Sequence, residues 1–179
     1  ETVCPVYATY HNPEGLNAMI YNRCVGTRYC SNNCAYKARR FNWFNYEFPS
    51  PLDQQLNTTI TTREVGVMEK CTFCVQRIKT AKYDAQSLGR DLKDGEVITA
   101  CQQTCPTKAI TFGNLMDTES AVSKNALRED SDKRDRQYEV FAELNYKPAI
   151  TYLKKVNTRE VAGHESDSHG SHETEQTHG

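Results

Sequence analysis

The chain has 179 residues, enough for one ordinary domain or two very small ones. Its mean hydropathy is −0.74, and no stretch approaches the roughly 18 consecutive apolar residues that a membrane-spanning helix needs, so the sequence predicts no direct membrane span and shows no signal peptide. The formal net charge of −1 gives no reason to expect a nucleic-acid partner.

The N-terminal segment predicts a β-hairpin. Residues 5–23 read as strand, turn and strand, with NPEG at 12–15 as the turn and AMIY at 18–21 as the returning strand. The chain begins ETVCPV, without an initiating Met and with Cys4-Pro5 close to its start. Because Cys-Pro normally closes an iron–sulfur run, we interpret the chain as a fragment that begins inside a motif.

The next segment, RCVGTRYCSNNCAYK at 23–37, carries the first block of cysteines. Cys24, Cys30 and Cys34 have the spacing C-x2-T-x2-C-x3-C. A cysteine at Thr27 would make this the cluster-binding run of bacterial ferredoxins, C-x2-C-x2-C-x3-C-P. The motif thus lacks its second cysteine ligand, and Ala35 occupies the position of its final proline.

A second cysteine block follows a polar connection, 38–66, which we expect to be a loop. It consists of CTFC at 71–74 and CQQTCP at 101–106, which gives the pattern C-x2-C-x26-C-x3-C-P. This is the ferredoxin motif with 26 residues in place of the two that normally precede its third cysteine. The apolar period after CTFC predicts a helix that ends at Gly89. GEVITAC at 95–101 and KAITFGNL at 108–115 predict two short strands.

The C-terminal third predicts an accessory extension and a tail. We expect a helix in TESAVSKNAL (118–127), capped by Asp117, a second helix at 137–145 and a short segment at 148–156. Residues 161–179 hold four of the five histidines and four acids without Lys or Arg; this composition is typical of a disordered solubilising tail, with a metal-binding tail as the alternative. The expected fold class is α+β, with a ferredoxin-type domain at 1–112, a helical extension at 113–160 and the tail at 161–179.

Three chemistries could use eight cysteines. Disulfides suit a secreted chain, but tight spacings such as C-x2-C suit metal chelation better. Zinc would use CTFC and CQQTC as two halves of one site, although zinc ribbons repeat C-x2-C and do not need the final proline. Because both cysteine blocks are variants of one ferredoxin-type spacing, the sequence favours iron–sulfur clusters over disulfides and over zinc.

Counting ligands predicts clusters of two kinds. Cys4, Cys24 and Cys30 supply three thiolates, which predicts a [3Fe–4S] cluster with Thr27 over the vacant corner; the alternative is a [4Fe–4S] cluster ligated by the Thr27 oxygen, a poor match for soft iron. Cys34 would complete a [4Fe–4S] cluster whose other ligands lie upstream. Cys71, Cys74 and Cys101 would hold another with its fourth ligand upstream, and Cys105 would be a ligand of a cluster whose other ligands also lie upstream.

Three stretches carry a family resemblance: YNRCVGTRYCSNNCAYKARRFNW (21–43), GVMEKCTFCVQRI (66–78) and ITACQQTCPTKAITFG (98–113). Together they resemble the electron-transfer iron–sulfur subunits of the molybdopterin oxidoreductase families. Because CVGT replaces CxGC, the chain is more similar to the iron–sulfur subunit of alternative complex III, a bacterial quinol-oxidising membrane complex. The resemblance covers residues 1 to about 157.

This resemblance implies a subunit of the respiratory chain that relays electrons without catalysis of its own. The implied partners are a membrane quinol-binding subunit and c-type cytochrome subunits, at the periplasmic face of the bacterial inner membrane. The alternatives are the β subunit of a molybdopterin-dependent reductase of the polysulfide, dimethyl sulfoxide or nitrite type, and a structural zinc protein. The sequence offers no Ser-His-Asp set, phosphate loop or supported carboxylate pair, so we expect no independent active site.

Overall fold

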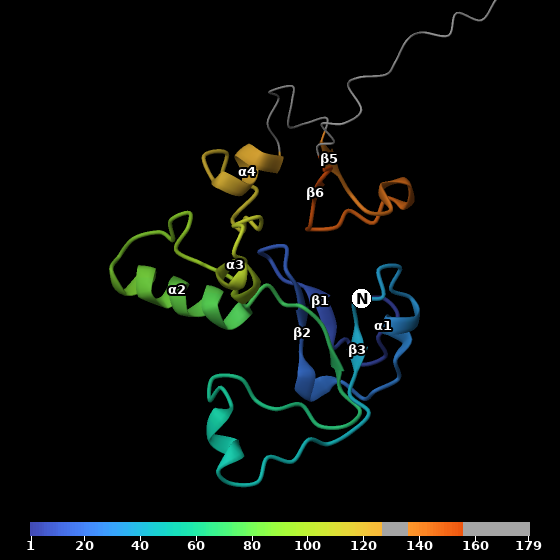
Figure 1. The fold of residues 1–179 in the computed structure, drawn as a ribbon. Helices are drawn as coiled ribbons and strands as arrows, with labels where there is room; N and C mark the ends of the chain where they lie inside the picture. The colour runs from blue at the N-terminus through green and yellow to red at the C-terminus, as the bar shows by residue number, and fades with distance from the viewer. Residues whose placement is uncertain (127–135, 156–179) are drawn as a thin grey trace, which may run out of the picture. The chain divides into compact units, whose positions relative to one another are not determined.

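The computed structural model describes residues 1–126 and 136–155 (Figure 1). It contains two compact units, residues 1–123 and 124–179, each of which is described by itself. Short helices and three two-stranded antiparallel sheets make up the described chain, a mixture compatible with the expected α+β class. No helix in the described ranges is long and apolar enough to cross a bilayer. The tail expected at 161–179 lies outside the described residues.

The predicted N-terminal hairpin is confirmed. Strand β1 (Thr9–His11) pairs antiparallel with β2 (Asn17–Met19), with Thr9 opposite Met19. The Asn12 side chain shapes the turn by accepting the Leu16 amide at 2.9 Å, and Gly15 has the left-handed φ of +80° that the turn requires. The returning strand is shorter than expected, because the chain enters a 3-10 turn, η1 (Tyr21–Arg23), just before Cys24.

A second two-stranded sheet closes the excursion that was expected to be a loop. Strand β3 (Arg40–Phe41) pairs with β4 (Met68–Glu69), with Phe41 opposite Met68. Most of the intervening chain is irregular, as predicted, but it includes a 3-10 turn, η2 (Leu52–Gln55). The side chain of Met68 is only 1% exposed and belongs to the small apolar core of unit 1, together with Ala8, Ile78, Ala85 and Val97.

The predicted central helix is confirmed as α2 (Val75–Ser87). It buries Ile78 and Ala85, two positions of the apolar period. The helix ends before Gly89, whose φ of +64° is the left-handed conformation typical of the residue after a helix.

The two strands expected around CQQTCP are absent from the described chain, so that prediction was wrong. Val97 and Thr99 are buried on either side of exposed Ile98, so the local pattern is extended. However, Thr99 begins helix α3 (Ala100–Thr104), where its side chain accepts the Gln102 amide. Lys108 has φ of +51°, which turns the chain out of strand geometry where the second strand should begin.

Helix α4 (Ala121–Ala126) lies within the predicted range, but its predicted cap was wrong. Ser120 Oγ accepts the Ser123 amide at 3.2 Å, which is the bond expected of an N-cap. The Asp117 carboxylate instead accepts the Glu119 amide at 3.0 Å in a local turn.

In unit 2, the helix predicted at 137–145 is also wrong. Strand β5 (Gln137–Tyr138) pairs with β6 (Tyr152–Leu153), and the rings of Tyr138 and Tyr152 stack at 5.5 Å across the pair. Between them lies only a 3-10 turn, η3 (Ala142–Leu144), flanked by Phe141 and Asn145 at φ of +59° and +54°. Cross-strand tyrosine pairing thus outweighs the local helical pattern.

Candidate iron–sulfur sites

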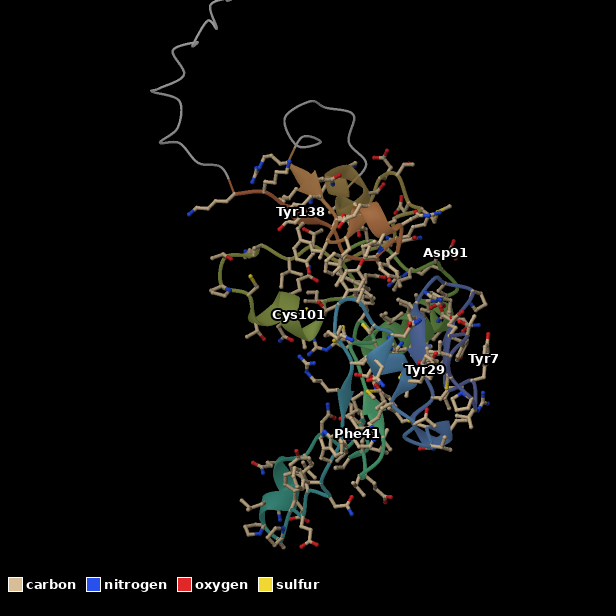
Figure 2. The ribbon with its side chains drawn as sticks, turned by 90° about the vertical axis from the view of Figure 1, so that its right-hand side faces the viewer. Tyr7, Tyr29, Phe41, Asp91, Cys101 and Tyr138 are labelled. Carbon is tan, nitrogen blue, oxygen red and sulfur yellow. The ribbon has the colours of Figure 1, made fainter. Side chains whose placement is uncertain are left out.

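All eight cysteines lie in the described chain, and none of them is in a disulfide. They come from the N-terminal segment, the η1–α1 region, the start of α2, and α3 with the turn that follows it (Figure 1). Cys101 is labelled in Figure 2. Over the described residues, no three His, Cys, Asp or Glu side chains converge on one point as the ligands of a single metal ion would.

Three of the predicted ligands share one pocket. Cys4, Cys24 and Cys30 line it together with Thr27. Cys4 precedes the hairpin, Cys24 follows η1, and Cys30 lies in the short helix α1 (Tyr29–Asn32). The fold therefore brings together from separate segments the same thiols, and the same threonine, that the spacing grouped.

Backbone amides point at the sulfurs of this pocket. Ala8 N donates to Cys4 Sγ at 3.2 Å, and Met68 N donates to Cys24 Sγ at 3.5 Å. Burial alone raises the pKa of the Cys4 thiol, but amide donors led by that of Ala8 bring the pKa below its ordinary value. The thiolate, which is the form that binds iron, is thereby favoured at Cys4.

Gly26, a residue that the sequence reasoning did not single out, shapes the loop between Cys24 and Thr27. Its φ is +73°, and a Cβ on it would lie 2.6 Å from the Gly66 carbonyl oxygen. The loop therefore passes directly against the backbone at 66–68, which in turn supplies the amide to Cys24. The glycine in CVGT was the available signal.

Cys74 and the start of α3 form a second junction. Ala100 N donates to Cys74 Sγ at 3.3 Å, so Cys74 lies beside the residue that precedes Cys101. Thr99 Oγ1 is 3.2 Å from Cys101 Sγ, and Phe73 N donates to Cys71 Sγ at 3.5 Å. The insertion of 26 residues is thus folded back, and the two halves of the second block meet.

Arg77 links α2 to the segment that contains α3 by hydrogen bonds. Its Nη1 donates to the Ile98 carbonyl at 2.8 Å and to Gln103 Oε1 at 2.9 Å. We expect Arg77→Ala to lower the free energy of unfolding by about 1 kcal/mol, and to speed iron loss to a chelator from the full-length subunit. Lys79→Ala, on the same helix, is the control; equal chelation rates in the two variants would contradict the role of Arg77.

Three cysteines open the same turn. The sequences are CPVYA at Cys4, CAYKA at Cys34 and CPTKA at Cys105. In each, the fourth residue has a left-handed φ: +52° at Tyr7, +51° at Lys37 and +51° at Lys108. Its amide donates to the cysteine carbonyl at 3.3, 3.2 and 3.2 Å, respectively. Ala35 in place of proline therefore leaves this backbone turn intact at Cys34.

The alanine that ends this turn presents its amide to the sulfur in both Cys-Pro copies. Ala109 N donates to Cys105 Sγ at 3.4 Å, as Ala8 N does to Cys4. Thr107 Oγ1 lies 3.3 Å from Cys105 Sγ, and this contact, followed by the Ala109 amide, lowers the pKa of the Cys105 thiol. The C-x-x-x-A repeat is a sequence signal for this geometry that cysteine spacing alone does not show.

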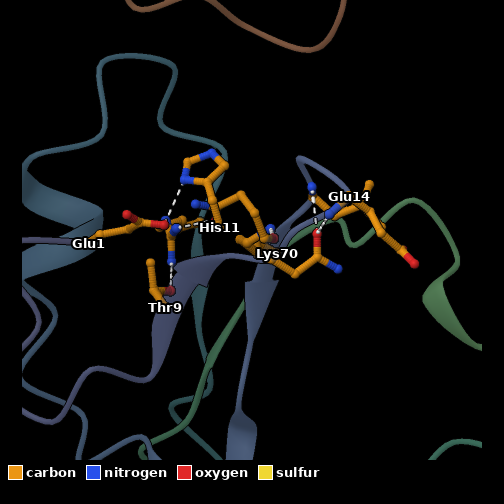
Figure 3. A network of polar contacts seen from close by, with 9 residues as sticks. Glu1, Thr9, His11, Glu14 and Lys70 are labelled. Carbon is orange, nitrogen blue, oxygen red and sulfur yellow. Dashed lines mark hydrogen bonds and ion pairs between the residues drawn. The ribbon is translucent and has the colours of Figure 1, made fainter. Parts of the chain in front are cut away.

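Two basic side chains, Arg39 and Lys70, bind the hairpin; Lys70 is labelled in Figure 3. Arg39 donates to Thr9 Oγ1 at 2.9 Å and to Asn17 Oδ1 at 3.0 Å. Lys70 Nζ donates to the Asn17 carbonyl. Burial, and then the charge of Arg39, lowers the pKa of Lys70 to about 8. Since Lys70 directly precedes Cys71, the hairpin is held against the start of the second block.

Comparisons with known proteins agree on one class of relative. No family model matches the chain. It is 38% identical over 176 residues to the iron–sulfur cluster-binding subunit of menaquinone reductase from Nitratidesulfovibrio vulgaris, a match that covers 96% of this chain and 66% of the relative.

Two further relatives point the same way. The chain is 36% identical over 155 residues to Hdr-like menaquinol oxidoreductase iron–sulfur subunit 1 of Archaeoglobus fulgidus, covering 85% of this chain and 51% of the relative. It is 38% identical over 122 residues to a putative dimethyl sulfoxide reductase iron–sulfur subunit of Halobacterium salinarum, covering 68% of this chain and 40% of the relative. This chain thus spans less than two thirds of the length of each of these two relatives. The chain is therefore a homologue of the iron–sulfur subunits of oxidoreductases, menaquinone-linked ones among them.

Proposed function

We propose that the chain is an electron-transfer iron–sulfur subunit that relays single electrons within a quinol-oxidising respiratory membrane complex. One observation carries the proposal: Cys4, Cys24, Cys30 and Thr27 line a common pocket. Each thiolate of a cluster binds a different iron atom, so cluster ligands stand farther apart than the ligands of one ion. Three thiols around a shared pocket provide the thiolate donors that an iron–sulfur cluster requires.

The ligand assignments follow from this pocket. Cys4, Cys24 and Cys30 would hold a [3Fe–4S] cluster, with Thr27 beside the corner that lacks a thiolate. Cys71, Cys74 and Cys101 would hold a [4Fe–4S] cluster, while Cys34 and Cys105 would each complete another. Bound clusters of this kind accept and release one electron at a time. The chain's own contribution is to fix the thiolates and to surround them with amide donors, which tune the clusters.

The names of two relatives support a quinone-linked complex. Two of the three relatives described above carry menaquinone or menaquinol in their names. We therefore propose that the chain works in a complex of the alternative complex III type. Its partners would be a membrane quinol-binding subunit and c-type cytochrome subunits, at the periplasmic face of the bacterial inner membrane. A β subunit of a molybdopterin-dependent reductase is the competing function, supported by the dimethyl sulfoxide reductase relative.

Electron paramagnetic resonance of the oxidised full-length subunit in its complex tests the assignment. We expect the parent to show an oxidised-state [3Fe–4S] signal that disappears in Thr27→Cys, because the new thiolate allows a fourth iron to bind. Iron content should rise by about one atom per subunit. Thr27→Ser, which retains a hydroxyl and adds no thiolate, should keep the signal.

Absence of the signal in the parent would overturn the cluster assignment. Thr27 would then close a [4Fe–4S] cluster, or the pocket would be empty, and the reductase β subunit would become the better interpretation. A subunit that contains zinc in place of iron would overturn the electron-transfer function itself.

A further inference from the structure

An acid-free stretch surrounds the first cysteine block. Between Gly15 and Tyr46 the sequence has five basic residues and no Asp or Glu. The chain as a whole carries 22 Lys and Arg against 23 Asp and Glu, so this stretch departs sharply from the overall balance. Such a local field selects an anionic partner. The five basic residues are Arg23, Arg28, Lys37, Arg39 and Arg40.

Three of these arginines line one polar pocket between α1 and β3. Arg28, Arg39 and Arg40 share it with neutral groups: the hydroxyls of Thr27 and Ser31, the amide of Asn32 and the rings of Phe41 and Trp43. The lining thus offers guanidinium, hydroxyl and amide donors without a carboxylate. Guanidinium forks and hydroxyls are the groups that bind phosphate oxygens.

The contacts that these arginines make leave their charges uncompensated within the described chain. Arg28 lies over the rings of Trp43 and Phe41, at 4.9 and 5.2 Å from their centroids. Arg40 donates to the Lys37 carbonyl at 2.7 Å, and Arg39 binds the neutral oxygens of Thr9 and Asn17. The ion pairs of the described residues involve none of the three. Packing and neutral acceptors therefore position the three cations for an external anion.

Exposed aromatic side chains follow the pocket along the chain. Trp43 is 59% exposed and Phe44 is 69% exposed, with exposed Tyr46 two residues further. Aromatic rings beside arginines are typical of segments that lie at the interface between lipid headgroups and acyl chains. A pocket for a free phosphate has no need of such rings outside it. The combination thus favours a phosphate at the surface of a bilayer.

We propose that this pocket binds the phosphate of an anionic phospholipid headgroup, with Trp43 and Phe44 entering the bilayer interface. The site uses no cysteine, but it shares Thr27 and Arg28 with the pocket of Cys4, Cys24 and Cys30, so the iron content of each arginine variant is measured beside its lipid binding. It would give the subunit its own contact with the membrane surface, in addition to any contact through a membrane subunit.

Co-sedimentation of the full-length subunit with lipid vesicles tests this site. We expect binding to vesicles that contain phosphatidylglycerol and little binding to vesicles of phosphatidylcholine alone. Arg28→Gln combined with Arg40→Gln should weaken binding to the anionic vesicles by at least about tenfold, since each cation near an anionic surface contributes about fivefold. The control is Lys79→Gln combined with Lys93→Gln, which removes the same charge elsewhere in unit 1 and should weaken binding much less.

Variants of the exposed aromatic side chains distinguish a lipid headgroup from free phosphate as the ligand of the pocket. Phe44→Ala combined with Tyr46→Ala, which truncates two exposed rings outside the pocket lining, should also weaken vesicle binding while leaving the iron content unchanged. Inorganic phosphate that stabilises the parent, but not the double arginine variant, against thermal unfolding, together with no vesicle binding, would overturn the lipid source. Equal vesicle binding by the arginine pair and the lysine control would overturn the site. Loss of assembly with a partner subunit in the arginine variant, without vesicle binding by the parent, would overturn the proposal in favour of an acidic protein surface.

Discussion

Replacing Gly26 with alanine is expected to lower the free energy of unfolding by at least about 2 kcal/mol. The variant is also expected to lose the cluster proposed for the pocket of Cys4, Cys24 and Cys30. A left-handed φ costs a non-glycine residue about 1–2 kcal/mol, and the φ of Gly26 is +73°. In addition, the new Cβ would lie 2.6 Å from the Gly66 carbonyl oxygen and 3.3 Å from a ring carbon of Phe41. Because the nearest atom belongs to the backbone, a side-chain rotation cannot relieve the contact.

The loss should be largest at the cluster pocket. Moving the 66–68 backbone away from Gly26 also moves the Met68 amide that donates to Cys24 Sγ. Denaturant unfolding of the full-length subunit gives the stability, and the oxidised-state resonance signal reports the pocket. Gly15→Ala is a matched control, because Gly15 has a φ of +80° but a Cβ there would meet nothing within 4 Å. Similar losses of signal in both variants would show that the close approach to Gly66 is unimportant.

The second large effect is expected from Met68→Ala, which should lower the free energy of unfolding by about 2–5 kcal/mol. The Met68 side chain is 1% exposed, contributes to the core of unit 1, and also lines the pocket of Cys4 and Cys24. Its truncation removes buried apolar contacts and leaves a void in the wall of the candidate cluster site. The same variant should therefore lose iron to a chelator faster than the parent.

Two methionine variants frame this result. Met116 is 89% exposed, so Met116→Ala should change the unfolding free energy by no more than about 0.5 kcal/mol. Met68→Leu keeps most of the volume and should cost less than about 1.5 kcal/mol. Denaturant titrations followed by far-ultraviolet circular dichroism would measure all three. A Met68→Ala protein as stable as the Met116→Ala protein would contradict the assignment of Met68 to the core.

Sequence reasoning succeeded where a local pattern and the folded contact coincide. The NPEG turn determines its own hairpin, and the apolar period after Cys74 determines α2, because both depend on neighbours within a few residues. Cys4, Cys24 and Cys30, which the ferredoxin-type spacing grouped, line one pocket. The ligand roles themselves stay predictions.

Sequence reasoning failed where contacts with distant segments determine the secondary structure. Residues 95–101 have a strand-like composition, but Thr99 caps α3 instead of pairing with another strand. Residues 137–145 have a helical composition, but Tyr138 pairs with Tyr152 from 14 residues away. Neither partner is visible in a local window. The turn at Cys34 is different: three copies of C-x-x-x-A were present in the sequence, and only the proline was taken as its signal.

The backbone segment that donates a hydrogen bond to Cys24 also affects the rate of electron transfer between the proposed clusters. Met68 N contacts Cys24 Sγ, and Cys71 follows only three residues later. Three residues of extended chain span at most about 11 Å, so this strut limits how far apart the two proposed clusters can lie. Electron tunnelling slows steeply with every added ångström of separation. The short β4 strand, held by its pairing with β3, would thus act as the spacer that sets the transfer rate between them.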